Sequence, residues 1–263
     1  MEETPSLSAG EASFQRMYQI PKLKEFPDLI HGFSTIDDGN MSFKFGGENE
    51  VFENRKRFLK KLGIKPDSCV CLMGQHGDKI VVVGKNDAGS GIKDYTGALR
   101  VDGLITKEKG LYLFMLAADC LPIIFYSPKR EIVGIIHAGW RGADNEIAVK
   151  TVKKLEKEFD CKATDLIIAF GPAALKDSYI KGNPSQKSLP KWEAFLEKIN
   201  DSKYKIDFVG FCKQQLIKAG VKKENLFESG VDTIKDSRFY SHYRDSKAQS
   251  GDKGRFACVV GIR

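Results

Sequence analysis

Three side chains that can bind a transition metal stand in short, turn-like strings of the sequence. His76 lies in GQHG, Cys120 lies in AADC between two apolar runs, and His137 begins HAGWRG at the end of another apolar run. Two imidazoles and a thiolate can hold zinc tetrahedrally while the fourth position stays open to water or substrate, as in catalytic zinc sites. A nucleophile pair of Cys120 and His137, which needs no metal, is an alternative.

The spacing of these residues is not a metal-binding signature by itself. They are 44 and 17 positions apart, and no CxxC or HExxH string accompanies them. From spacing alone the commoner role is structural, with Cys120 as a small buried side chain and the histidines as hydrogen-bonded turn residues. A metal site therefore needs support from other segments of the chain.

Strand ends are where such side chains can converge on a cleft, and the sequence predicts many strands. Short runs rich in Val and Ile and bounded by turn residues indicate buried strands. The runs are LIHGFST, SCVCLM, KIVVVG, LRVDGLIT, LYLFMLAA, LPIIFY, EIVGIIHA, DLIIAFG and FACVVGI.

Helices are predicted from apolar spacing or a terminal glycine at 54–64, 146–159, 190–199 and 207–220. The segment 181–190, KGNPSQKSLP, is expected to be a mobile loop. Because strands and helices do not follow a strict βαβ order, we expect an α+β fold rather than a Rossmann sheet. The expected architecture is a single layered domain of residues 21–263, with central mixed sheets flanked by helices, after a disordered tail of residues 1–20.

Composition favours an ordinary globular protein, with 41% hydrophobic and 29% charged residues and a net charge of +7 spread along the chain. Without a dense basic tract or a nucleic-acid motif, we expect no nucleic-acid partner. The longest apolar stretch is broken by Asp119 and Pro122, so no membrane span is expected. The six cysteines fit no disulfide framework, and the N-terminus lacks a signal peptide core. We expect a cytoplasmic protein with reduced thiols, as a monomer or a weak homo-oligomer.

Several strings together resemble the YfiH/laccase-domain family, whose members are described as polyphenol oxidoreductases, purine nucleoside phosphorylases or peptidoglycan editing factors. GQHG, AADCLPIIFY and HAGWRG occur in the order and spacing of that family. Further segments similar to its pattern are HGFST, Asn54-Arg55, Asp102-Gly103, GPAALKDSYI and the late YRD…GR. The resemblance covers roughly residues 28–262. It implies that His76, Cys120 and His137 bind one zinc, with any copper binding adventitious.

The resemblance also implies phosphorolysis of adenosine, inosine and S-methyl-5′-thioadenosine, together with deamination of adenosine. Deamination needs a metal-activated water to attack C6 of adenine. The usual HxE and PCxxC signature of zinc deaminases is absent. We therefore expect Asp119 or Asp102 to serve as acid or base, although either carboxylate can instead brace a ligand histidine.

Phosphorolysis needs cations that align phosphate with the sugar, and Arg55 and Arg141 are candidates. Arg141 stands near an expected helix start, where backbone N–H groups favour anions, and a salt bridge to a carboxylate is the equal alternative. Gln75 and Thr35, in segments similar to those of the family, are further candidates for substrate binding.

The string HAGWRG has an interpretation in these terms. Its preceding apolar run is a buried strand that delivers His137 to the metal. Gly139 and Gly142 should permit a turn and leave room for a ligand close to the backbone. Trp140 is expected to pack under the site, which is its commoner role, with stacking on a base as the alternative.

The histidine count argues against a multicopper laccase, because a mononuclear copper and a trinuclear cluster need many imidazoles. Apart from His76 and His137 the chain has only His31 and His242, and it has no HxH pair. Two other functions stay open: an amidase that acts on peptidoglycan precursors, and a scaffold that zinc stabilises without catalysis.

Several positions depart from the family pattern. Where STR-x-GG is usual, STIDDGN places Ile36 and Asp37 and lacks the arginine. Later, Asp232-Thr233 stands in place of a cysteine-threonine pair, and SHYRD, with His242, stands in place of SYRR. The strings with the zinc ligands are intact, so the sequence supports the metal better than the substrate.

Overall fold

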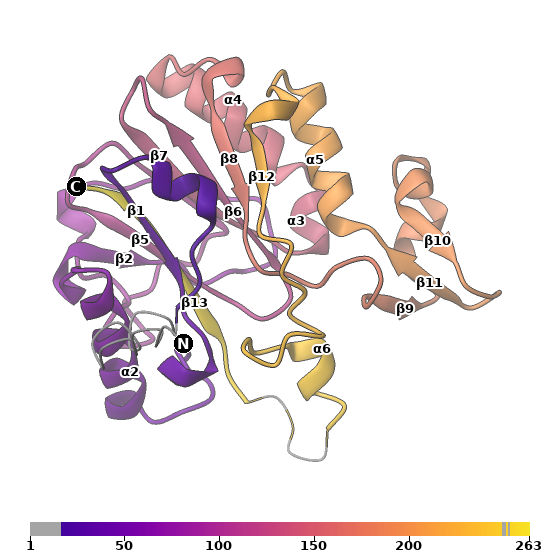
Figure 1. Ribbon diagram of the computed structural model, residues 1–263, viewed down its shortest axis with the longest axis horizontal. Helices are drawn as coiled ribbons and strands as arrows, with labels where there is room; N and C mark the ends of the chain where they lie inside the picture. Colours follow the sequence, from indigo (N-terminus) through magenta and orange to yellow (C-terminus); the bar gives the residue numbers. More distant parts are fainter. Residues whose placement is uncertain (1–16, 249–250, 252) are drawn as a thin grey trace, which may run out of the picture.

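The computed structural model describes residues 17–248, 251 and 253–263, and two β-sheets lie face to face at its centre (Figure 1). The first sheet has four strands, in the order β1 (Leu29–Phe33), β13 (Phe256–Ile262), β5 (Tyr112–Ala117) and β2 (Cys69–Cys71). The second has six strands, in the order β12 (Leu226–Glu228), β8 (Ile167–Phe170), β6 (Leu121–Ser127), β7 (Ile132–Ala138), β4 (Gly103–Thr106) and β3 (Ile80–Val82). Both sheets are mixed, because β2 runs parallel to β5, β12 to β8 and β3 to β4.

Helices cover the outer faces of both sheets. Helix α2 (Glu48–Lys61) packs on the four-stranded sheet. Helices α4 (Ile147–Phe159) and α5 (Phe208–Lys218) pack on the six-stranded sheet. Between the sheets, side chains such as Met115 and Ile124 form a separate apolar core. The predicted α+β fold of central mixed sheets flanked by helices is confirmed.

The predicted elements of this body are largely confirmed. Each of the nine apolar runs contains a strand, because most of these strands are buried on both faces, which favours Val, Ile and Phe. The helices predicted at 146–159 and 207–220 correspond to α4 and α5, whereas α2 begins six residues before the predicted 54–64. Two short helices complete the body: α3 (Trp140–Asp144) and α6 (His242–Asp245).

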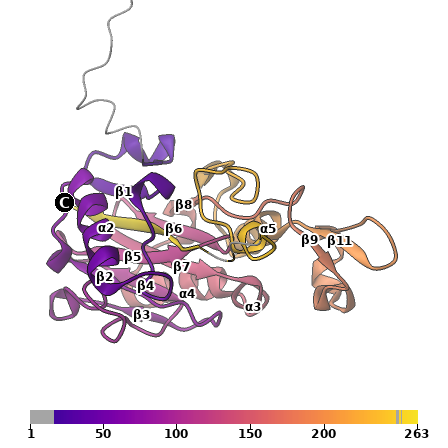
Figure 2. The ribbon, with the colours of Figure 1, turned by 90° about the horizontal axis from the view of Figure 1, so that it is seen from below.

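A third, small antiparallel sheet projects from this body as an arm (Figure 2). Its strands are, in order, β10 (Leu196–Lys198), β11 (Lys203–Ile206) and β9 (Ile180–Gly182). The helix predicted at 190–199 is wrong: η7 (Pro190–Phe195) is a 3-10 helix, and β10 follows it. Pairing with β11 and burial of Trp192, whose ring stacks on Phe211 with 3.7 Å between centroids, override the helical spacing. Segment 181–190 is built from β9 and η6 (Ser185–Ser188).

The remaining connections contain short 3-10 helices. These are η1 (Pro21–Glu25), η2 (Ile36–Asp38), η3 (Pro66–Ser68), η4 (Lys85–Asp87), η5 (Ala163–Asp165) and η8 (Lys223–Asn225). All six cysteines are free thiols. Across the part of the chain that the structure describes, no helix is both long and apolar enough to cross a membrane.

The domain boundary lies earlier than predicted. Residues 1–16 of the expected tail lie outside the described residues. Tyr18, however, pairs with Phe33 by two backbone hydrogen bonds, and Ile20 is only 1% exposed. Because these contacts bury apolar surface against β1, the folded domain includes residues before 21.

Candidate metal site

His76, Cys120 and His137 lie together at the turn that joins the two main sheets. Cys120 stands in the turn between β5 and β6, His76 in the loop between β2 and β3, and His137 near the end of β7. Their ligand atoms all lie within 4.8 Å of one another. The two imidazoles meet nearly at right angles, with 5.0 Å between ring centroids. Side chains distant in the sequence thus form a three-point cluster.

The Asp102 carboxylate orients two residues of this cluster through hydrogen bonds. Its carboxylate lies 3.0 Å from Nδ1 of His137 and accepts hydrogen bonds from the amides of His76 (2.9 Å) and Gly77 (2.8 Å). The Asp102 side chain is buried, and these hydrogen bonds help to hold its pKa below the usual range although burial raises it. With Nδ1 occupied, Nε2 of His137 is the nitrogen available to a metal. Of the two roles expected for Asp102, this geometry favours the brace over the acid or base.

Glycine lets the backbone approach the cluster closely. A Cβ added at Gly74 would come within 2.6 Å of Nδ1 of His137. One added at Gly139 would lie 3.0 Å from the His76 ring and 3.5 Å from Sγ of Cys120. The φ of Gly139 is −76°, so this position needs space rather than left-handed backbone. Gly139 therefore allows close contact between the backbone and the cluster, rather than a turn of left-handed backbone.

Charge pairing perturbs the pKa of two residues of the cluster, the half-buried Cys120 and the buried His137. Burial would raise the pKa of the Cys120 thiol, but the charge and hydrogen bonds of His137 and His76 outweigh burial and lower it to about 6. Burial would lower the pKa of His137, but the Cys120 thiolate and the Asp102 carboxylate outweigh burial and raise it to about 10. A thiolate that forms at neutral pH beside two imidazoles, one of them held by a carboxylate, fits the ligand preference of zinc.

Iodoacetamide is expected to alkylate Cys120 of the metal-free protein well before the other cysteines. The thiolate is the reactive form. Because the pKa of Cys120 is lowered to about 6, its reactivity should be full at neutral pH and fall as the pH drops through about 6. Burial raises the pKa of all five other thiols, those of Cys69, Cys71, Cys161, Cys212 and Cys258. Peptide mass spectrometry across a pH series measures each rate, and equal rates at all six cysteines would contradict the expectation.

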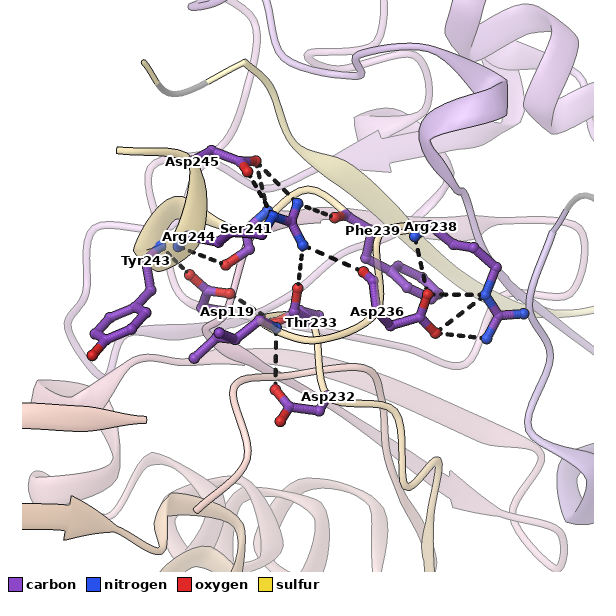
Figure 3. Close-up of polar contacts among 11 residues, drawn as sticks. Asp119, Asp232, Thr233, Asp236, Arg238, Phe239, Ser241, Tyr243, Arg244 and Asp245 are labelled. Atoms are coloured by element: carbon purple, nitrogen blue, oxygen red, sulfur yellow. Dashed lines mark hydrogen bonds and ion pairs between the residues drawn. The ribbon is translucent and has the colours of Figure 1, made fainter. Parts of the chain in front are cut away.

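Asp119, next to Cys120, has a φ of +84°, which residues other than glycine seldom adopt. One carboxylate oxygen accepts a hydrogen bond from the Thr233 hydroxyl (2.7 Å), and the other accepts one from the Tyr243 amide (2.6 Å) (Figure 3). Both oxygens therefore fasten the late segment of the chain, residues 232–245, to the turn that carries Cys120. This geometry favours a structural role over the acid or base role expected for Asp119.

The late segment is itself tied together around Arg244. Its guanidinium donates to the carbonyl oxygens of Thr233 and Phe239, at 2.8 Å each, and pairs with Asp245 (Figure 3). The Ser241 hydroxyl caps α6 by accepting from the Arg244 amide. We call these contacts, together with those of Asp119, the clasp. The clasp explains how a loop with little regular structure holds α6 in place.

Two cavities open beside the cluster. The aromatic cavity, of about 550 Å³, is lined by Trp140, Tyr179, Phe208 and Tyr243 and by the cations Arg141, Lys181 and Lys247. The cationic cavity, of about 520 Å³, is lined by Phe43, Phe45 and Tyr95 and by the cations Lys44, Arg55, Arg100 and Arg255. Both include His76, Ala118, Cys120 and His242 in their walls. The cluster therefore stands at the wall that the two cavities share.

The expected substrate residues differ in their places. Arg55 lines the cationic cavity, but it is 1% exposed and its guanidinium donates to the carbonyl oxygens of Met41, Gly91 and Ile92. Arg55 is thus largely committed to the local backbone. Thr35 is buried and contacts the Asp38 carboxylate at the start of η2, and it lines neither cavity. The structure places Thr35 away from both cavities, because its segment packs into the fold.

Gln75 and Arg141 both reach cavities. Gln75 is exposed in the wall of the cationic cavity, where its amide donates to the Met73 carbonyl (2.9 Å). Arg141 is exposed in the wall of the aromatic cavity and lies over the Trp140 ring, 4.7 Å from its centroid. No carboxylate of the described residues forms an ion pair with Arg141, so its alternative role in a salt bridge is not seen.

Sequence reasoning missed Tyr179, Lys181 and Tyr243 as cavity walls. Tyr179 and Tyr243 meet edge to face at 5.7 Å, and Lys181 lies over both rings. The two tyrosines stand in the strings GPAALKDSYI and SHYRD, yet no spacing links these strings. The Tyr243 hydroxyl, which donates to the Ile180 carbonyl (2.6 Å), makes that link in space.

Residues 30–263 match the family described as multi-copper polyphenol oxidoreductase laccase. The chain belongs to this family. The purine nucleoside phosphorylase YlmD of Geobacillus stearothermophilus is 32% identical over 237 residues, which cover 85% of this chain and 83% of that relative. The purine nucleoside phosphorylase YlmD of Bacillus subtilis is 27% identical, over 90% and 89% of the two chains.

Solved structures agree with the family assignment. YlmD from Geobacillus stearothermophilus superposes with a TM-score of 0.85 at 30% identity, covering 90% of this chain and 93% of that one. The Bacillus licheniformis hypothetical protein YfiH gives 0.84 at 28% identity, covering 91% and 95%. The resemblance to the YfiH family and the fold it implied are therefore confirmed.

Proposed function

We propose that this protein is a zinc-dependent purine nucleoside phosphorylase that also deaminates adenosine. The observation that carries the proposal is the cluster of His76, Cys120 and His137 at the shared wall of two cavities, in a chain whose relatives are named purine nucleoside phosphorylases. Three ligands leave room for a substrate atom, whereas a purely structural zinc is enclosed by four. The substrates expected are adenosine, inosine and S-methyl-5′-thioadenosine.

The residues present suit this chemistry. Zinc held by the cluster would supply a Lewis acid beside both cavities. Asp102 keeps the His137 ring in one orientation, and the clasp fixes Tyr243 and His242 as walls. Aromatic walls favour a planar base, and Lys and Arg side chains favour phosphate. Four histidines in the whole chain are too few for multicopper oxidation.

Inosine should yield hypoxanthine and ribose 1-phosphate only when phosphate is present, because phosphate is the nucleophile of phosphorolysis. The measurement is chromatography of products formed in phosphate and in phosphate-free buffer. Adenosine should release ammonia in both buffers, since water is the nucleophile of deamination. If hypoxanthine forms equally well without phosphate, the enzyme is a hydrolase and not a phosphorylase. If no purine nucleoside gives a product but the amide of a muramyl peptide precursor is cleaved, the enzyme is an amidase.

A further inference from the structure

The two cavities offer different surroundings to a ligand. Four cations line the cationic cavity, and its carboxylate, Asp94, is turned into its own loop by hydrogen bonds from the Thr96 hydroxyl and the Gly97 amide, at 2.8 Å each. One of the cations, Arg55, is a buried guanidinium fixed by three carbonyl oxygens, so its charge is held in place at low dielectric. This is the more favourable of the two environments for a doubly charged anion.

The aromatic cavity has fewer cations and more flat side chains. Four aromatic residues line it, Trp140, Tyr179, Phe208 and Tyr243, against three in the cationic cavity, and three cations line it against four there. Its carboxylate, Asp119, already accepts two hydrogen bonds within the clasp. Flat walls bind a purine ring through stacking and edge contacts. The base of a nucleoside is the better occupant of this cavity.

The stereochemistry of phosphorolysis requires such a division. Phosphate attacks C1′ of the ribose from the face opposite the departing base, so nucleophile and leaving group must approach from two sides of one carbon. The two cavities meet at residues that line both of them, among them Ala118, Cys120 and His242. A ribose at these residues would direct its base into one cavity and present the opposite face to the other.

We propose that inorganic phosphate binds in the cationic cavity, beside Arg100, and that the purine base occupies the aromatic cavity. This inference rests on the proposed function and states where the phosphate and the purine base bind. An oxygen of hydrogen phosphate forms the bond to C1′ as the bond from C1′ to N9 breaks. The base leaves with the electron pair of that bond, and the proton of hydrogen phosphate ends on the base. Arg141, in the aromatic cavity, is then a neighbour of the nucleoside and does not bind phosphate.

Arg100→Ala and Arg141→Ala form a matched pair for the test, because both arginines are exposed and each lines one cavity. Arg100→Ala should raise the KM for phosphate by roughly tenfold or more, the loss expected for a hydrogen bond to a charged group, and leave the KM for inosine within about twofold. Arg141→Ala should leave the KM for phosphate within about twofold. If the KM for phosphate rises more in Arg141→Ala than in Arg100→Ala, or equally in both, the assignment of phosphate to the cationic cavity is wrong.

Binding of inorganic phosphate without nucleoside separates this inference from the proposed function. Titration calorimetry of wild type and both variants with phosphate alone should show weaker binding only for Arg100→Ala. If wild type turns over no nucleoside but this pattern appears, the phosphate site stands and the phosphorylase proposal fails. If Arg100→Ala binds phosphate as wild type does, the site is wrong whatever the activity.

Discussion

Cys120→Ala is expected to lose zinc and both activities while the fold persists. Cys120 supplies the one thiolate of the cluster, and two imidazoles alone leave a weaker and less enclosed site. The three apolar cores do not depend on this side chain, which lies in a turn. Elemental analysis of purified protein measures the zinc, product chromatography measures activity, and circular dichroism checks the fold.

Cys212→Ala is the matched control, because the same substitution is made at a cysteine of α5 that is buried in the core. It should keep one zinc per chain and full activity. Cys120→Ser should fail as Cys120→Ala does, since an alcohol is a poor zinc ligand at neutral pH. His242→Ala and His31→Ala should keep the metal, because neither ring belongs to the cluster. If exhaustively chelated wild type keeps full activity, the zinc mechanism is wrong and a Cys120–His137 nucleophile is favoured.

Asp102→Asn should weaken zinc binding by about 10- to 100-fold, the usual effect of removing a carboxylate that orients a ligand histidine. The carboxylate accepts from His137 and from two backbone amides. An amide side chain keeps one oxygen and presents an NH₂ group where a further acceptor is needed, so one donor stays unsatisfied. Competition with a metallochromic chelator measures the affinity independently of catalysis.

Asp201→Asn provides the comparison for that measurement, because it makes the same change at a fully exposed carboxylate on the arm. Its zinc affinity should equal that of wild type. Asp102→Asn with unchanged zinc affinity and reduced activity would instead return Asp102 to the role of acid or base.

The strands that carry the cluster could be predicted from local patterns in the sequence, and the three residues of the cluster from the family resemblance. Apolar runs with turn residues at their ends predict strands, and His76, Cys120 and His137 stand at or after such ends. The glycine strings around them have a physical reason that spacing alone does not show. A Cβ at Gly74 would collide with the His137 ring, and one at Gly139 would crowd the His76 ring.

The arm, the clasp and the cavity walls could not be predicted in the same way. Residues 190–199 have helical spacing, and only pairing with β11, a strand that no apolar run predicts, turns their end into β10. Arg55 is a cation in a string similar to the family's, and its three carbonyl partners come from segments that no periodicity connects to it. Such contacts depend on tertiary packing, which local patterns do not encode.

The turn between β5 and β6 joins the two sheets, and the cluster draws His76 from a loop after the first sheet and His137 from a strand of the second. Zinc held there would act as a reversible cross-link between the sheets. Because unfolding releases a metal that binds only the folded chain, zinc at a hundredfold excess over its dissociation constant adds about 2.7 kcal/mol to the free energy of unfolding. The melting temperature should then report free zinc, so the supply of metal would set the lifetime of the protein as well as its activity.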